Sequence, residues 1–334
     1  TNLLEAAAAC STMRLFRTAQ KKEGLRFGEN HAFIFADFLA QERDISLELR
    51  FSRTKAMEIY KNGVRQKRQS DAQGLLTTVL FCPEDLMLVR AGAAARRLFL
   101  DTALCQMRPN YARYLDEYNR LHEHKTRILR DSEEKPSLLS MWEDFSLRMA
   151  HIGAQIIRYR AYYCRKLLKA AAAVYADIAP HEVLSGVYKT VSSVTDPFAD
   201  ARTIEKQLID HVFSHKTAEI AAKSCLSGPH KDDLELLLDG RSAASFGSQG
   251  QVRTCTLSLK LAERELFFDE DGEYPVLLLD DVLSELDRRR QDFVLNRISA
   301  GQVMITCCED GISEKLRAGA VFHIQNGEKS AETH

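Results

Sequence analysis

Hydrophobic residues follow two different patterns along the chain, and each pattern predicts a different kind of element. Short apolar runs at residues 32–38, 45–51, 57–60 and 75–81 are typical of strands. They predict an antiparallel β layer within the first hundred residues.

The middle of the chain instead carries apolar residues three and four positions apart, the spacing of a helix face. Two stretches show this repeat, and Lys125 takes one position where an apolar residue is expected. The polar, proline-terminated segment 131–136 separates them, so an antiparallel helical hairpin should form, an arm roughly 40 Å long at 1.5 Å per residue. The repeats are Leu104, Met107, Tyr111, Tyr114, Tyr118, Leu121 and Ile128, then Phe145, Met149, Ile152, Ile156, Tyr159 and Tyr163.

Further elements follow the arm. Residues 201–223 predict a helix, 234–238 with Asp239 and Gly240 predict the start of a hairpin, and 276–280, 302–306 and 321–324 predict strands. A chain of 334 residues exceeds what one core usually organises. We therefore expect an α/β head formed by residues 1–101 and 224–334, with a helical arm domain at 102–223 inserted between them.

One apolar run ends abruptly at two carboxylates. Residues 275–279 have no alternation, which is typical of a strand buried on both faces of a parallel sheet, and Asp280 and Asp281 follow. Ligands of open α/β sheets bind beyond the carboxyl ends of the strands. This pattern alone fits a metal-nucleotide site and a core strand with a polar turn about equally.

A glycine-containing loop precedes this strand by one helix. Ser248, Gln249, Gly250 and Gln251 stand before a stretch to Phe268 that has no Gly or Pro and apolar residues at helical spacing. A helix N-terminus offers free N–H groups and a partial positive charge to a phosphate. Taken alone, the loop is equally an ordinary helix cap.

Charge is unevenly distributed although the net charge is only −1. No acidic residue occurs between Phe145 and Ala176, where tyrosines lie among six cations, and a second basic cluster surrounds the hairpin signal Asn62-Gly63. Such clusters can neutralise phosphates, and the alternative is a solvated helix face. The six cations are Arg148, Arg158, Arg160, Arg165, Lys166 and Lys169. The residues predicted to bind DNA come from both clusters and are Lys61, Arg65, Lys67, Arg68, Arg158, Arg165 and Lys169.

Composition is consistent with a cytosolic globular protein. No apolar stretch approaches the roughly 20 residues of a membrane span, and no signal peptide is recognisable. The eight cysteines include no CxxC pair, which favours reduced thiols. His211 and His215 could share a helix face as metal ligands, but no third ligand accompanies them at a known spacing.

The motifs together resemble the RecF family of bacterial recombination mediators, and they span nearly the whole chain. A Ser-x-Gly-Gln loop, a helix, a strand ending in Asp280 and then Ser284 with Asp287 stand in the order of ABC-type ATPases. The segments that carry the RecF resemblance are 81–86, 96–101, 228–234, 246–254, 257–263 and 278–287.

The resemblance implies an ABC/SMC-type ATPase head that holds ATP and Mg²⁺ between two copies of the chain. Thr1 and Asp280 of one copy would hold Mg²⁺, and Asp281 would position the attacking water. An Asp instead of the usual Glu at this position, and Cys307 near the place of a switch His, imply slow hydrolysis. The cofactor-binding residues that the resemblance implies are Thr1, Ser248, Gln249, Gly250, Gln251 and Asp287, with the four loop residues and Asp287 acting across the dimer interface.

The resemblance also implies partners. The family binds DNA at the junctions of single and double strands in gaps, works with RecR and RecO, and helps to load RecA onto strands coated with SSB. We therefore expect a cytoplasmic DNA-binding mediator that forms an ATP-dependent homodimer and does not act at membranes.

Two expectations concern this chain in particular. In the RecF family the string that begins at Thr1 follows directly on the Gly-Lys of a phosphate-binding loop, so the sequence resembles one truncated inside its nucleotide site, and weak ATP binding is expected.

A transport ATPase is disfavoured by the arm and the basic clusters. Another SMC-like repair ATPase would have a far longer arm with a hinge, and a non-catalytic DNA-binding scaffold stays an alternative.

Overall fold

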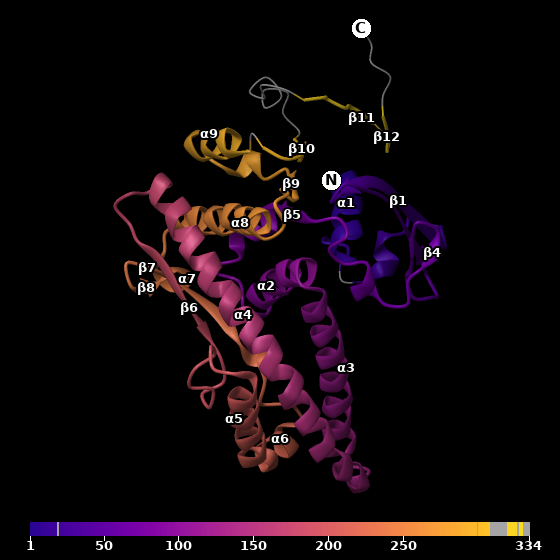
Figure 1. The fold of residues 1–334 in the computed structure, drawn as a ribbon, viewed down its shortest axis with the longest axis vertical. Helices are drawn as coiled ribbons and strands as arrows, with labels where there is room; N and C mark the ends of the chain where they lie inside the picture. Colours follow the sequence, from indigo (N-terminus) through magenta and orange to yellow (C-terminus); the bar gives the residue numbers. More distant parts are fainter. Residues whose placement is uncertain (19, 299, 308–318, 326, 330–334) are drawn as a thin grey trace.

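A computed structural model describes residues 1–18, 20–298, 300–307, 319–325 and 327–329, which form a head and a projecting helical arm (Figure 1). The head contains a parallel sheet in the order β10 (Val303–Thr306), β9 (Val276–Asp280) and β5 (Thr78–Phe81). Four of the five residues of β9 are buried, so the apolar run does form a strand covered on both faces. Helix α1 (Asn2–Thr12) packs on β5 and β9, and α8 (Gln249–Asp271) packs on β5.

The predicted antiparallel layer consists of β1 (His31–Ala40), β2 (Arg43–Ser52), β3 (Glu58–Lys61) and β4 (Val64–Arg65), in that order. Asn62 and Gly63 join β3 to β4 with φ of 48° and 76°, as in the type I′ turn that Asn-Gly favours. The prediction was wrong for the fourth apolar run: β5 belongs to the parallel sheet, because three of its four residues are buried and it pairs with β9.

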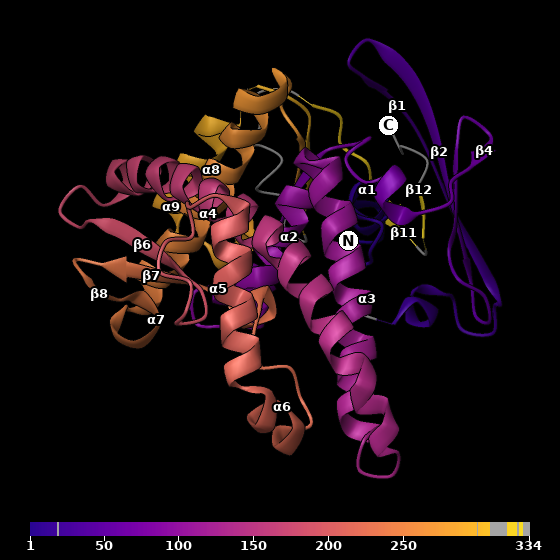
Figure 2. The same ribbon diagram turned by 60° about the horizontal axis from the view of Figure 1, so that its bottom comes forward.

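The arm is an antiparallel helical hairpin, as predicted. Helices α3 (Pro109–Asp131) and α4 (Trp142–Ile178) pack against each other, and the 3₁₀ helix η4 (Pro136–Met141) lies in the turn (Figure 2). The predicted seam was wrong at its start, since Leu104 and Met107 belong to α2 (Ala93–Met107). Arg108 is extended, with φ of −136°, as expected for a residue directly before a proline.

Helix α4 continues past the arm and packs on α8 and on α5 (Ala201–Ser214). The helix predicted at 201–223 is two helices, because the backbone leaves the helical conformation at His215, and α6 (Lys216–Ala222) follows. Lys125 of α3 is buried there, with its Nζ 2.7 Å from Oε2 of Glu219 in α6. The polar residue in the apolar seam is therefore half of a buried ion pair.

A third sheet joins the base of the arm to the C-terminal part of the head. Strand β6 (Leu184–Lys189), which the sequence analysis missed, pairs with β7 (Asp233–Leu238), and β8 (Arg241–Ser242) completes the predicted hairpin. The short helix α7 (Ala243–Phe246) leads from β8 to α8.

The remaining elements are short. The 3₁₀ helices are η1 (Lys21–Gly24), η2 (Gln69–Asp71), η3 (Pro83–Met87), η5 (Pro229–Lys231) and η6 (Leu283–Glu285), and α9 (Arg288–Arg297) precedes β10. Of the strand predicted at 321–324 only Ile324 is in a strand: β11 (Ile324–Gln325) pairs with β12 (Glu328–Lys329). Among the described helices, none has the length and apolar character needed to cross a membrane.

Candidate functional site

The first candidate group forms where α1 begins and β9 ends. Leu4 and Ala8 of α1 pack with Leu278 of β9 in one small core cluster. This packing brings the main-chain nitrogen of Thr1 to 3.6 Å from Oδ1 of Asp280. A helix N-terminus attracts anions, and here it lies beside the carboxylate of Asp280.

Asp280 and Asp281 have different surroundings although they are adjacent. Asp280 is buried, and its Oδ1 accepts a hydrogen bond of 2.8 Å from Oγ1 of Thr306. Asp281 is half-buried and has a positive φ of 53°. Its backbone N–H donates to Thr306, and its carbonyl accepts from Ser284. Both residues are thus tied to Thr306 of β10, Asp280 through its carboxylate and Asp281 through its backbone, while the Asp281 carboxylate accepts from Ser284 at 3.3 Å.

The Asp280 carboxylate is the kind of ligand that a magnesium ion prefers. Mg²⁺ prefers carboxylate and other oxygen ligands, and it is usually held by one or two carboxylates with substrate phosphates completing the shell. Asp280 offers one buried carboxylate, and the role of the Thr1 hydroxyl as a second ligand stays a prediction. Cys307 is exposed directly after β10.

The second candidate group is the loop at the start of α8. Oγ of Ser248 accepts from the backbone N–H of Gln251, and Oε1 of Gln251 accepts from the backbone N–H of Ser248. This reciprocal capping box fixes the loop. Ser248 and Gln249 are exposed and Gly250 is half-buried, so the surface at this helix N-terminus is open to a ligand.

Arg290, which the sequence analysis did not single out, joins this loop to Asp287. Its Nη2 donates to the carbonyl of Gly250 at 3.0 Å, its Nε donates to Oγ1 of Thr254 at 2.9 Å, and its Nη1 pairs with Asp287. Asp287 also caps α9. The predicted residues at 248–251 and Asp287 therefore form one surface. Arg290 joins them, although Gly250 lies 40 positions from Arg290 in the sequence.

The two groups are not brought together within one chain. In Figures 1 and 2 the helix α7, from which the loop emerges, lies on the left, and the N-terminus lies on the right of the molecule. The structure thus brings Thr1 together with Asp280, and the loop together with Asp287, as two separate surfaces.

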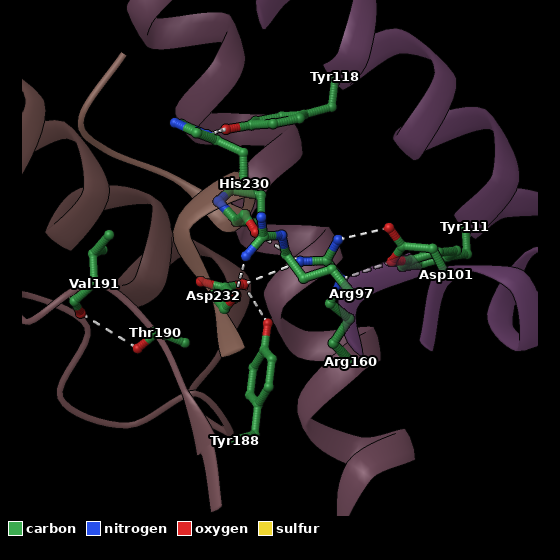
Figure 3. Close-up of polar contacts among 11 residues, drawn as sticks. Arg97, Asp101, Tyr111, Tyr118, Arg160, Tyr188, Thr190, Val191, His230 and Asp232 are labelled. Atoms are coloured by element: carbon green, nitrogen blue, oxygen red, sulfur yellow. Dashed lines mark hydrogen bonds and ion pairs between the residues drawn. The ribbon is translucent and has the colours of Figure 1, made fainter. Parts of the chain in front are cut away.

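The segment 228–233, for which the sequence analysis had no explanation, forms a buried polar network (Figure 3). Arg160 of α4 donates to Asp101 of α2 at 2.8 and 2.9 Å, donates to the carbonyl of Pro229 at 2.7 Å, and lies 3.4 Å from Asp232. Tyr188 of β6 also donates to Asp232. Burial raises the pKa of the Asp232 carboxyl to about 6 despite these partners. The network joins the arm helix, the head and the third sheet.

His230 completes the segment. Its Nε2 donates to the carbonyl of Cys225 at 3.1 Å and its Nδ1 accepts from the Tyr118 hydroxyl at 2.7 Å, which fits a neutral ring. Burial lowers the pKa of His230 to about 3. Gly228 has a φ of 124°, and a Cβ there would collide with the Tyr118 hydroxyl, so both features require glycine.

The predicted basic residues are mostly exposed, on two different surfaces. Lys67 and Arg68 follow the hairpin turn, and Arg65 pairs with Glu58 at 2.9 Å while Lys61 is half-buried. On α4, Arg165 stacks on Tyr162 and Phe198, Lys169 is exposed and Arg158 is half-buried. The grouping of Arg160 with these cations was wrong, because its guanidinium is 3% exposed and serves the internal network.

The two histidines weighed as metal ligands do stack, with ring centroids 4.0 Å apart. Nδ1 of His211 is bonded to Ser227, and Nδ1 of His215 lies 2.8 Å from the carbonyl of His211. Within the described residues no group of three or more His, Cys, Asp or Glu side chains could hold a metal ion.

Comparison with solved structures defines the class. The chain superimposes on the Smc head domain derived from Pyrococcus yayanosii with a TM-score of 0.52 at 11% identity, covering 98% of this chain and 89% of that one, which shows the fold alone. The fold is that of an ABC/SMC-type ATPase head with an antiparallel β layer and an inserted helical hairpin.

Closer relatives define the family. The chain is 34% identical over 333 residues to the DNA replication and repair protein RecF of Clostridium tetani (98% of this chain, 89% of the relative) and 36% identical over 333 residues to that of Bacillus subtilis (98% and 89%). It matches the structure of the recombination mediator protein RecF-ATPrS in the RecFOR pathway with a TM-score of 0.90 at 30% identity, covering 98% and 88% of the two chains. A scan against protein-family models finds no match. The chain belongs to the RecF family of DNA replication and repair proteins.

Proposed function

We propose that this protein is an ATP-dependent DNA-binding recombination mediator that acts at gap junctions between single- and double-stranded DNA. It works with RecR and RecO and helps to load a recombinase, while ATP gates the closure of a homodimer. The observation that carries this proposal is the meeting of the α1 N-terminus with Asp280 in a chain that is 30% identical to RecF bound to an ATP analogue.

The residues have distinct tasks at the nucleotide. Asp280, fixed by Thr306, and the Thr1 hydroxyl would hold Mg²⁺, which would neutralise phosphate charge. Asp281 orients the water. The N–H groups at residues 248–251 of a second copy receive the γ-phosphate, because the loop and the Asp280 group lie on different surfaces of one chain.

Two sets of cations, most of them exposed, contact DNA phosphates. Because phosphate contacts carry no sequence information, removing them weakens binding to all sequences alike. The two sets are Lys61, Arg65, Lys67 and Arg68, then Arg158, Arg165 and Lys169.

The test is the salt dependence of binding to a labelled gapped oligonucleotide, with and without ATP. The binding assay uses the full-length protein. Replacing either set with Ala should lower the slope of log affinity against log salt by about 0.9 for every duplex phosphate that is no longer neutralised. A protein that binds no DNA at low salt, with or without ATP, would overturn the proposal.

A further inference from the structure

A pocket of about 470 Å³ lies between the head and the arm, outside the nucleotide site. One wall is Arg68, in the loop after β4, and the other wall is the side of α3 and α4 that faces this loop. The arm side contributes Arg113, Arg120, His124, Phe145 and Arg148. We call this surface the arginine groove.

The guanidinium groups of the arginine groove are incompletely neutralised by neighbouring acids. Arg113 lies 4.0 Å from Asp71, and Arg148 lies 3.9 Å from Glu117 and 3.8 Å from Asp144, all longer than a hydrogen bond. Arg120 pairs with Asp116 one helical turn away, and its side chain remains 60% exposed. Glu117 is the one carboxylate in the lining. Four arginines and one carboxylate thus line the pocket itself, while Asp71, Asp116 and Asp144 lie beside it and offset part of the positive charge.

Two rings lie among these arginines. The centroids of His124 and Phe145 are 6.1 Å apart with the planes tilted by 40°. His124 is exposed and Phe145 is half-buried. Aromatic faces beside a row of cations are the combination with which proteins bind single-stranded nucleic acid, because bases stack on the rings while arginines meet the phosphates.

We infer that the arginine groove holds a single-stranded segment of nucleic acid. This inference rests on the proposed function, and it gives the unpaired strand of the junction a binding site. The forked guanidinium matches the oxygens of a phosphate. The pocket volume of about 470 Å³ is that of a site for one small ligand, which fits an unpaired base with its phosphate. Bases in a duplex are also stacked on one another and cannot reach His124 and Phe145, whereas unpaired bases can.

The groove also links two surfaces that are distant in sequence. Arg68 belongs to the basic cluster around the hairpin, and Arg148 belongs to the basic stretch of α4, so the structure joins members of both clusters at one site. Arg113 and Arg120 lie on α3, and two acidic residues, Asp116 and Glu117, lie between them. The segment from Arg113 to Arg120 therefore has no net charge, so charge counting along the sequence did not select these arginines.

The experiment measures binding of a labelled thymidine oligonucleotide and of a blunt duplex of equal length across a salt series. The groove variant combines Arg113→Gln, Arg120→Gln and Arg148→Gln, none of which belongs to the sets proposed above. The control variant combines Lys189→Gln, Arg202→Gln and Lys206→Gln, which are equally exposed cations on β6 and α5. A third variant replaces the same three groove arginines by Lys, which preserves charge, and circular dichroism verifies that all variants fold.

For the single strand, the groove variant should lose at least tenfold in affinity at 0.1 M salt, and its salt slope should fall by about 0.7 for every phosphate that is no longer neutralised, about 2 in total. The control and the lysine variants should keep most of the affinity and the slope. Equal single-strand binding by the groove and control variants overturns the inference, and so does a loss confined to the duplex. If the unmodified protein binds no DNA at all, the proposed function falls as well, so the two failures are distinguishable.

Discussion

At the scale of residues, the structure separates two neighbouring carboxylates by what holds them. Asp280 is buried and receives a hydrogen bond from Thr306, whereas Asp281 is half-buried and turns out of the strand in the left-handed conformation. A group that binds metal needs a fixed position beside the phosphates, and a group that orients water needs access to solvent. The two environments match these two tasks.

The first prediction tests this division of roles. Asp280→Asn should weaken Mg²⁺-dependent ATP binding at least tenfold, because it removes the charge beside α1. Asp281→Asn should leave ATP affinity within about threefold and prolong the ATP-bound dimer, because hydrolysis slows. Titration with a fluorescent ATP analogue at several magnesium concentrations measures the first effect, and dimer lifetime after dilution measures the second. Equal losses of nucleotide affinity in both variants would contradict the assignment.

A second prediction concerns Glu263 of α8. It is 3% exposed, its Oε2 accepts no hydrogen bond, and Lys260 lies 3.8 Å away. Burial raises the pKa of its carboxyl from 4.5 to about 7. The folded state therefore binds this proton more tightly than the unfolded state. Its contribution to the free energy of unfolding is largest below pH 4.5 and is lost as the pH rises towards 7.

Glu263→Gln keeps the shape and removes this titration. The variant should be more stable than the unmodified protein at pH 8, by roughly 1–3 kcal/mol on the scale of 1.36 kcal/mol per pKa unit, with a smaller difference at pH 5. Urea unfolding at both pH values measures it. Glu265→Gln, on the same helix but with a side chain 45% exposed, is the control. A pH dependence that is the same in all three proteins would show that Glu263 is ionised throughout.

The sequence identified residues best where a local motif fixes their task. Ser248 and Gln251 were predicted as one loop, and they form a reciprocal cap; the pairing of Thr1 with Asp280 came from the family resemblance, and the main-chain nitrogen of Thr1 lies 3.6 Å from Asp280. Arg160 and Arg290 could not be assigned, because their partners are distant in the sequence: Asp101 lies 59 positions from Arg160, and Gly250 lies 40 positions from Arg290. A buried arginine and an exposed one look alike in a basic stretch.

At the scale of elements, prediction succeeded where a pattern has one physical meaning. Asn62-Gly63 gave a tight hairpin because both residues tolerate positive φ, and the unalternating run before Asp280 gave a strand buried on both faces. Strand β6 was missed because its sequence, Leu-Ser-Gly-Val-Tyr-Lys, does not alternate between apolar and polar residues. The break between α5 and α6 has no Gly or Pro to signal it.

The arm offers a third prediction, about the polar residue in its seam. Lys125 of α3 pairs with Glu219 of α6, and Glu219 also accepts from the indole N–H of Trp142 in α4 at 3.0 Å. The ion pair and the hydrogen bond therefore link three helices, α3, α4 and α6, through the Glu219 carboxylate. Lys125→Met should cost about 3–5 kcal/mol of unfolding free energy, because Glu219 is left as an uncompensated buried charge.

The double variant Lys125→Met with Glu219→Gln removes that charge and should recover a large part of the loss. Chemical denaturation of both variants and of Glu219→Gln alone completes a double-mutant cycle. If the single and double variants lost the same free energy, packing rather than charge would explain the effect.

At the scale of the whole molecule, the structure divides the nucleotide residues between two surfaces of one chain. The Asp280 surface lies at the end of the parallel sheet, and the loop surface is built by α8, Arg290 and Asp287. Under the proposed function, either surface alone would contact only part of a triphosphate. ATP can therefore act as the link between two copies, and the arginine groove would then occur twice in the closed dimer.

The last prediction follows from this division. Ser248→Arg should leave ATP binding by the monomer within about threefold, because Ser248 lies away from Asp280, but it should abolish ATP-driven dimerisation, because the long cation blocks the loop from the γ-phosphate of the other copy. Ser245→Arg, an exposed serine three residues earlier in α7, adds the same charge and is the control. Analytical ultracentrifugation with and without ATP distinguishes them. A Ser248→Arg protein that still dimerises with ATP would show that the loop only caps α8, and a Ser245→Arg protein that fails to dimerise would show that added charge alone prevents association.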